Sequence, residues 1–148
     1  MSKDNGLASY QSLQPEYNLY DRADYEKELE PVCRENGLGV ITYYSLASGF
    51  LTGKYRSESD LSKSKRGQGI KRYLNDRGFK ILDALDKVAK AYNTSPACVA
   101  IAWVIARPGI TAPIASATTV KQLNEITKAT SLNLDKVAIE LLNAASSY

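Results

Sequence analysis

The sequence predicts an α/β protein built on a parallel sheet. Three short segments rich in apolar, β-branched and aromatic residues have the character of strands, at residues 10–17, 38–44 and 110–115. Helical patterns lie between and after them, because apolar residues recur there every three or four positions. A strand that returns to its sheet through a helix runs parallel to the previous strand. The expected order is strand, helix, strand, helices, strand, helix, helix.

One helix is expected between the first two strands. Asp21 can cap its start, and Asn36-Gly37 stops it. Its apolar residues fall at helical spacing: Tyr25, Leu29, Val32 and Cys33. Residues 38–44 are then almost continuously apolar, as in a strand covered on both faces.

The composition of residues 51–75 turns to Ser, Lys, Arg and Gly, which predicts a loop longer than compact domains usually carry. Its basic part, residues 63–72, is interpreted either as a solvated surface or as a lid reaching toward ligand phosphates. Gly67-Gln68-Gly69 is not a dinucleotide fingerprint, because it lacks a third glycine and a preceding strand.

Two helices are expected before the third strand. The first spans residues 76–92, and its apolar face carries Phe79, Leu82, Leu85, Val88, Ala89 and Tyr92. Ser95-Pro96 then combines a capping hydroxyl with proline at the first helical position. The helix that follows, residues 97–107, is apolar on all sides and should be buried.

Two further helices follow the third strand. Thr118 or Thr119 can cap the first, which carries Val120, Leu123 and Ile126. Asp135 begins the second, whose inward face is expected to hold Val137, Leu141, Leu142 and Ala145. A three-stranded parallel sheet has two open edges with unpaired backbone groups, which suggests that further strands belong to it.

Composition restricts the function classes. A chain of 148 residues, 44% of them hydrophobic, is expected to form one globular domain over residues 1–148. A net charge of +3 is too small to indicate a nucleic-acid partner, and no apolar run is long enough for a membrane span. The first residues lack a signal-peptide core, so a cytoplasmic location is expected. Cys33 and Cys98 are expected to be buried thiols, and with no histidine no metal site is expected.

Two motifs carry a family resemblance. Residues 12–19 read Ser-Leu-Gln-Pro-Glu-Tyr-Asn-Leu, and residues 42–55 read Thr-Tyr-Tyr-Ser-Leu-Ala-Ser-Gly-Phe-Leu-Thr-Gly-Lys-Tyr. In this order and spacing they resemble the sixth and seventh strands of the aldo-keto reductase barrel, and residues 113–126 resemble its eighth strand and following helix. The resemblance implies a partial (β/α)8 TIM barrel, with three parallel strands and flanking helices.

The resemblance also implies a nicotinamide cofactor, NADP (NADPH), and residues that hold it. Gln14 matches the glutamine that binds the nicotinamide carboxamide, since an amide both donates and accepts. Tyr43 matches the aromatic residue that stacks on the ring, with Tyr44 as the alternative. The loop formed by Ser45, Leu46, Ser48 and Gly49 matches the one that wraps the pyrophosphate. Relatives often have proline where this chain has Ser45.

The segment after the third strand resembles the family's adenosine-phosphate site. Ser116, Thr118 and Gln122 match phosphate contacts at a helix N-terminus, and Glu125 matches an adenine contact. Some relatives carry a lysine and an arginine here that this chain lacks at the matching places. Lys121 can supply charge instead, and the choice between NADP and NAD stays open.

The resemblance leaves the chemistry unassigned. In this family a tyrosine acid, tuned by a lysine, an aspartate and usually a histidine, lies on earlier strands, so no catalytic residue is assigned here. Two functions are therefore expected. The chain is the C-terminal, cofactor-binding part of an NADP-dependent aldo-keto reductase, inactive alone and with weak or lost cofactor binding, or a non-catalytic module completed by a partner chain that supplies the missing barrel strands.

Overall fold

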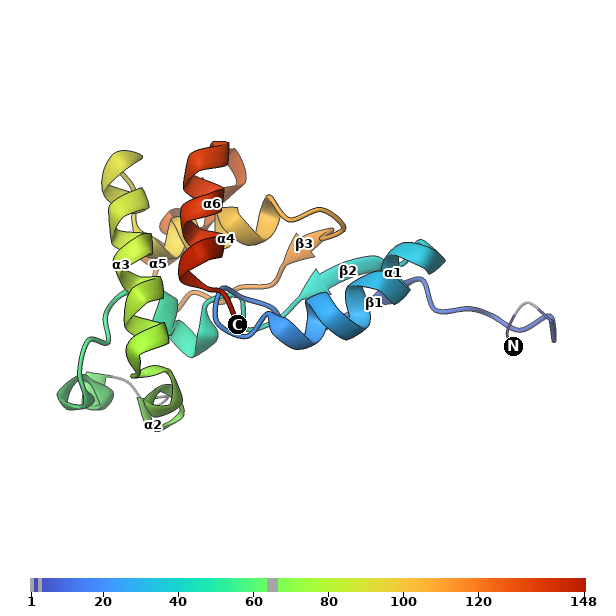
Figure 1. Ribbon diagram of the computed structural model, residues 1–148, viewed down its shortest axis with the longest axis horizontal. Coiled ribbons are helices and arrows are strands. Elements are labelled where there is room, and N and C mark those ends of the chain that lie inside the picture. The colour runs from blue at the N-terminus through green and yellow to red at the C-terminus, as the bar shows by residue number, and fades with distance from the viewer. Residues whose placement is uncertain (1, 3, 64–66) are drawn as a thin grey trace.

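The computed structural model describes residues 2, 4–63 and 67–148, which form a three-stranded parallel sheet with flanking helices (Figure 1). The strands lie in the order β1 (Ser12–Leu13), β2 (Gly39–Thr42) and β3 (Ala112–Pro113). Ser12 lies opposite Gly39 and Ile41 lies opposite Ala112, both in parallel register. The expected α/β class, a partial barrel with three parallel strands, is confirmed.

The regular strands are shorter than the sequence indicates, although backbone pairing continues beyond them. The N–H of Tyr43 donates to the carbonyl of Pro15 at 3.0 Å, and the N–H of Ile114 donates to that of Thr42 at 2.7 Å. Tyr10, expected in the first strand, is 89% exposed and lies outside it. The carboxyl ends of all three strands are therefore bonded side by side.

Helical elements occupy much of the remaining described chain. The helices and turns are η1, a π turn (Tyr25–Leu29), α1 (Glu30–Asn36), η2 (Ala47–Thr52), η3 (Glu58–Lys63), α2 (Gly67–Ile70), η4 (Lys71–Tyr73), α3 (Asp76–Ala91), α4 (Pro96–Ile105), α5 (Val120–Thr127), η5 (Lys128–Ser131) and α6 (Lys136–Ala145). No helix within the described ranges is long and apolar enough to cross a membrane.

The expectation of a long loop at residues 51–75 is wrong. Short helical turns occupy most of it, because the buried side chains of Tyr55, Ile70 and Tyr73 anchor the segment to the core. Ser64, Lys65 and Arg66 of the basic stretch lie outside the described residues. Whether that stretch is a lid or a solvated surface therefore remains a prediction.

The core is built around α4. Residues 97–104 are all buried, which confirms the expectation for a helix that is apolar on all sides. α3 packs against α4 and also against α6, beside which it stands in Figure 1. Two of these helices begin at the expected capping residues. The side chain of Ser95 accepts from the N–H of Cys98 at the start of α4, and that of Asp135 accepts from the N–H of Ala138 at the start of α6. Gly37 ends α1 in the left-handed conformation.

The expected inward face of the last helix is corrected, and other apolar residues of the expected helical patterns are exposed as well. Six apolar residues are exposed instead: Leu29, Val32, Val120, Leu123, Val137 and Leu141. The π turn before α1 carries an extra residue per turn and shifts the helical phase. In α6 the buried stripe instead runs through Ala138 and Leu142. None of the residues of α5 is fully buried.

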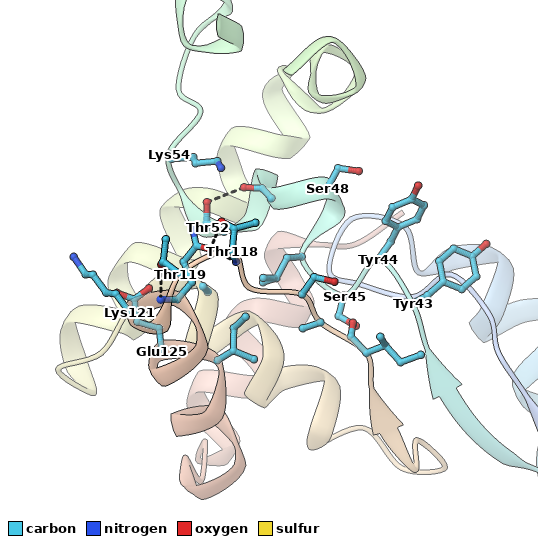
Figure 2. Close-up of a pocket in the computed structure, with 18 residues that line it drawn as sticks. Tyr43, Tyr44, Ser45, Ser48, Thr52, Lys54, Thr118, Thr119, Lys121 and Glu125 are labelled. Atoms are coloured by element: carbon cyan, nitrogen blue, oxygen red, sulfur yellow. Dashed lines mark hydrogen bonds between the residues drawn. The ribbon is translucent and has the colours of Figure 1, made fainter. Parts of the chain in front are cut away.

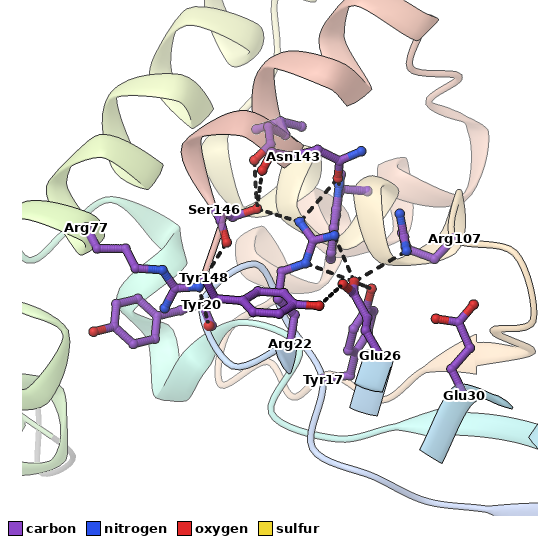
Figure 3. A network of polar contacts seen from close by, with 12 residues as sticks. Tyr17, Tyr20, Arg22, Glu26, Glu30, Arg77, Arg107, Asn143, Ser146 and Tyr148 are labelled. Atoms are coloured by element: carbon purple, nitrogen blue, oxygen red, sulfur yellow. Dashed lines mark hydrogen bonds and ion pairs between the residues drawn. The ribbon is translucent and has the colours of Figure 1, made fainter. Parts of the chain in front are cut away.

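A partly buried ion network joins η1 to the C-terminal residues (Figure 3). The Glu26 carboxylate accepts from the Tyr17 hydroxyl at 2.6 Å, from Arg22 Nε at 2.8 Å and from the Tyr148 hydroxyl at 2.9 Å. Burial alone would raise the pKa of Glu26, but the hydrogen bonds from Tyr17 and Arg22 and the Arg22 charge hold it below its usual value. The network therefore favours an ionised Glu26.

The expectation that Asp21 caps the first helix is wrong. Its carboxylate accepts from the Tyr73 hydroxyl at 2.8 Å and pairs with Arg72 at 3.1 Å. The Asp21 side chain therefore bonds to residues of η4, far along the chain, and does not cap the first helix.

Candidate functional site

A cleft of about 760 Å³ lies at the carboxyl ends of β2 and β3 (Figure 2). One wall is the loop at residues 43–54, and the other is the segment at residues 114–126 that leads from β3 into α5. Parallel sheets bind ligands at this end of their strands. The cleft is lined by nine of the ten residues expected at a cofactor: Tyr43, Ser45, Leu46, Ser48, Gly49, Ser116, Thr118, Gln122 and Glu125.

Gln14, the tenth, lies outside the cleft. The sheet register places it on the same face as Ile41 and Tyr43, because Leu13 and Val40 pair toward the core. It therefore directly follows β1, on the same face of the sheet as Tyr43. Its side chain is exposed and does not line the cavity.

The wall after β2 is a strained turn. Tyr44, Ala47 and Ser48 have φ values of 54°, 48° and 56°, in the left-handed region that residues other than glycine rarely adopt. Gly49 follows at φ 96°, where the missing side chain removes the steric cost. Such conformations persist only where the surroundings enforce them, and they cluster at functional sites.

The first motif provides part of that enforcement, because it lies along the second. The N–H of Tyr17 donates to the carbonyl of Tyr43 at 3.2 Å. The side chain of Asn18, which is completely buried, donates to the carbonyl of Tyr44 at 3.1 Å. Sequence reasoning did not assign Asn18 a role, although its place directly after Tyr17 inside the motif was a signal.

Ser45 lies in the cleft wall, but its hydroxyl is buried. It is 1% exposed, and its hydroxyl donates to the carbonyl of Ile114 at 3.1 Å. This bond joins the two walls of the cleft. The structure thus places the Ser45 hydroxyl against protein, whereas its backbone remains on the wall.

The opposite wall contains the start of α5. Thr119 caps this helix, since its side chain accepts from the N–H of Gln122 at 3.2 Å. Thr118 donates through both its N–H and its hydroxyl to the side-chain oxygen of Gln122, each at 2.9 Å. The expected alternative between Thr118 and Thr119 as the cap is thereby decided for Thr119, and Thr118 and Gln122 form one local unit.

The cleft carries both charges and an aromatic pair. Lys54 and Lys121 line it together with Glu125, which makes the lining positive by one charge. A Cβ added to Gly49 would lie 3.7 Å from Lys54 Nζ, so the glycine leaves room for the ammonium beside the turn. The rings of Tyr43 and Tyr44 lie 5.2 Å apart and tilted by 58° at one end. The structure thus separates an aromatic end from an end with a helix N-terminus and cations.

Two buried tyrosine hydroxyls, those of Tyr17 and Tyr73, lie outside the cleft. Burial, followed by the hydrogen bond to Glu26, raises the pKa of Tyr17, whose hydroxyl points into the network of Figure 3. Burial raises the pKa of Tyr73 as well. Among the described residues there is no group of three His, Cys, Asp or Glu side chains that could hold a metal ion. The geometry suits binding of an anionic, partly aromatic ligand.

Comparisons with known proteins agree with the fold and the motifs. The model of the aldo/keto reductase family matches residues 3–147. The uncharacterised oxidoreductase YrpG of Bacillus subtilis is 36% identical over 131 residues, which cover 88% of this chain and 38% of that protein. The aldo-keto reductase yakc of Schizosaccharomyces pombe, whose name carries NADP(+), is 30% identical over 116 residues, covering 76% of this chain and 34% of that protein.

One further relative and one solved structure are also similar to this chain. A probable voltage-gated potassium channel subunit beta of Oryza sativa is 36% identical over 121 residues, covering 78% of this chain and 37% of that protein. The crystal structure of the thermostable aldo-keto reductase Tm1743 with the inhibitor epalrestat superposes with a TM-score of 0.65 at 24% identity. The match covers 89% of this chain and 38% of that one. The chain thus spans well under half the length of these proteins.

Proposed function

The chain belongs to the aldo/keto reductase family of oxidoreductases, and on that premise we propose that residues 1–148 form the C-terminal, cofactor-binding part of an NADP-dependent barrel. The observation that carries the proposal is the cleft of about 760 Å³ lined by nine of the ten expected residues. Cofactor clefts commonly have about 300–1,000 Å³. A cytoplasmic location is part of the same proposal.

The residues present fit a dinucleotide phosphate. Tyr43 would stack on the nicotinamide, and the backbone of Ser48 and Gly49 would hold the pyrophosphate. The first N–H groups of α5 have no partner within their own helix, and together with Lys121 they would attract the phosphate on the adenosine ribose. Gln14 would reach the carboxamide from the neighbouring strand. The bound nicotinamide would supply a hydride for reduction of a carbonyl group.

We propose that the 148-residue chain by itself does not reduce carbonyl compounds. A general acid must lie within hydrogen-bond reach of the reacting oxygen and have a suitable pKa. The chain has no histidine, and two of its four buried tyrosines, Tyr17 and Tyr73, donate to Glu26 and Asp21. The proposed role of this part is to bind and orient the cofactor.

The alternative function, a module completed by a partner chain, is favoured by the open sheet. β1 and β3 form its two edges. A second, apolar groove of about 400 Å³ runs beside β3 and is lined by Ile101, Ile105, Ile126 and neighbouring residues. Unpaired edges of this kind readily add strands. Co-expression with the portion of the Bacillus relative outside its matched residues tests this, and a stable one-to-one complex in light scattering is its expected result.

The proposed cofactor site is tested by titrating the purified chain with NADPH, 2′,5′-ADP and nicotinamide mononucleotide. We expect weak binding, with 2′,5′-ADP retaining most of the affinity because the phosphate contacts are local to α5. Thr118→Ala should weaken NADPH binding more than Gln14→Ala does, since Thr118 orients Gln122. Equal affinity for NADPH and nicotinamide mononucleotide would refute the assignment.

A further inference from the structure

The only side chain among the described hydrogen bonds that contacts the backbone of the turn at Tyr43 and Tyr44 is the buried amide of Asn18. Asn18 Oδ1 accepts from the N–H groups of Tyr20 and Asp21, at 2.8 and 2.9 Å. Two backbone donors require an oxygen at this position, so the amide orientation is determined and Nδ2 faces the other way. There Nδ2 donates to the carbonyl of Tyr44 at 3.1 Å and to Asp21 Oδ2 at 3.3 Å.

Tyr44 needs this support. Its φ of 54° is unfavourable for a bulky residue, and the residue is 51% exposed, so it lies outside the buried core. Its carbonyl accepts from Asn18 and, at 2.7 Å, from the N–H of Ala47. The preceding residue is already fixed, because Tyr43 bonds to Pro15 and Tyr17 through its backbone. The Asn18 contact therefore links the first motif to the carbonyl at which the chain turns.

The conformation of this turn positions the aromatic side chains at one end of the cleft. The rings of Tyr43 and Tyr44 lie side by side, 5.2 Å apart, at that end (Figure 2). A Tyr44 that relaxed to negative φ would move its own ring and the wall that follows. The other end of the cleft, at Thr118 and Thr119, makes no contact with Asn18 in the hydrogen bonds described.

We infer that Asn18 is a positioning residue: it holds Tyr44 in the left-handed conformation and thereby orients the aromatic pair that faces the nicotinamide end of the cleft. Asp21 extends this support, because it bonds to Asn18 and also accepts from the Tyr73 hydroxyl at 2.8 Å. The part that concerns nicotinamide rests on the proposed function. The part that concerns Tyr44 does not.

The experiment compares Asn18→Ala and Asn18→Asp with the unmodified chain. Asn18→Asp keeps oxygen acceptors for Tyr20 and Asp21 but removes the donor to Tyr44, so it remains informative if Asn18→Ala does not fold. Asp135→Ala is the matched control, because it removes a side-chain cap from α6. The backbone φ of Tyr44 is measured from its carbon chemical shifts and its amide coupling constant in NMR spectra.

We expect the positive φ of Tyr44 in the unmodified chain and in Asp135→Ala, and its loss in both Asn18 variants. Affinity for nicotinamide mononucleotide should fall about fivefold in the Asn18 variants, the effect of one lost hydrogen bond of ~1 kcal/mol, whereas affinity for 2′,5′-ADP should stay within about twofold. Retention of the positive φ in the Asn18 variants, or an equal loss of both affinities, would overturn the inference. If the unmodified chain binds neither ligand, the proposed function fails, and the conformation of Tyr44 alone decides the role of Asn18.

Discussion

Replacing Gly78 by alanine should destabilise this protein, although the same change in most helices is stabilising. Gly78 lies in the first turn of α3, where alanine is ordinarily favoured by up to ~1 kcal/mol. A Cβ built on it would lie 1.9 Å from the carbonyl oxygen of Tyr73 and 3.0 Å from Phe50 Cζ. The first contact is with backbone, so a side-chain rotation cannot relieve it.

The magnitude follows from what must move. Tyr73 stacks on Phe50 with ring centroids 5.1 Å apart, and its carbonyl accepts from the N–H of Asn75, the N-cap of α3. Overpacking of this kind costs up to ~3 kcal/mol, and subtracting the ~1 kcal/mol of helix propensity leaves ~2 kcal/mol. For a domain of this size that lowers Tm by ~4–8 °C.

The assay is urea unfolding followed by the fluorescence of Trp103, the single tryptophan, which is completely buried. Gly69→Ala is the control, because a Cβ there meets nothing within 4 Å, and in α2 the change should be neutral or stabilising by up to ~1 kcal/mol. A Gly78→Ala variant as stable as the unmodified chain, or more stable, would show that α3 and η4 are not in the contact described.

Two further perturbations test the packing and the cleft wall. Glu26→Gln removes the charge that Arg22 pairs with and should lower the free energy of unfolding by ~3 kcal/mol at pH 7. The pKa of Glu26 lies below its usual 4.5 in the folded state. This contribution is therefore present above pH 4.5 and is lost as the pH falls through the folded pKa, so urea unfolding at pH 7 and pH 3 should show a narrower gap between the two proteins at pH 3. A gap as wide at pH 3 as at pH 7 would contradict the assignment. Thr119→Ala should cost ~1 kcal/mol and accelerate hydrogen exchange in α5 alone, with α3 as internal reference; uniform acceleration would indicate that Thr119 does more than cap α5.

Much of this protein could be anticipated without coordinates, because the relevant signals are local. Ser95-Pro96, Asp135 and Gly37 act on backbone groups within a few positions, and the elements begin or end there as expected. The strand order follows from the alternation of strands and helices. The resemblance of the two motifs and of the segment after β3 to the aldo-keto reductase barrel likewise indicated nine residues that line one cleft.

Only the tertiary structure decided the contacts that join distant parts of the chain. The Asp21 carboxylate serves Tyr73 and Arg72 in place of a helix start, and Glu26 bonds to Tyr148, 122 positions away. The Ser45 hydroxyl bonds to Ile114 across the cleft. A local pattern determines backbone conformation and the period of an apolar face, whereas the partner of a polar side chain depends on which surfaces the whole chain brings together.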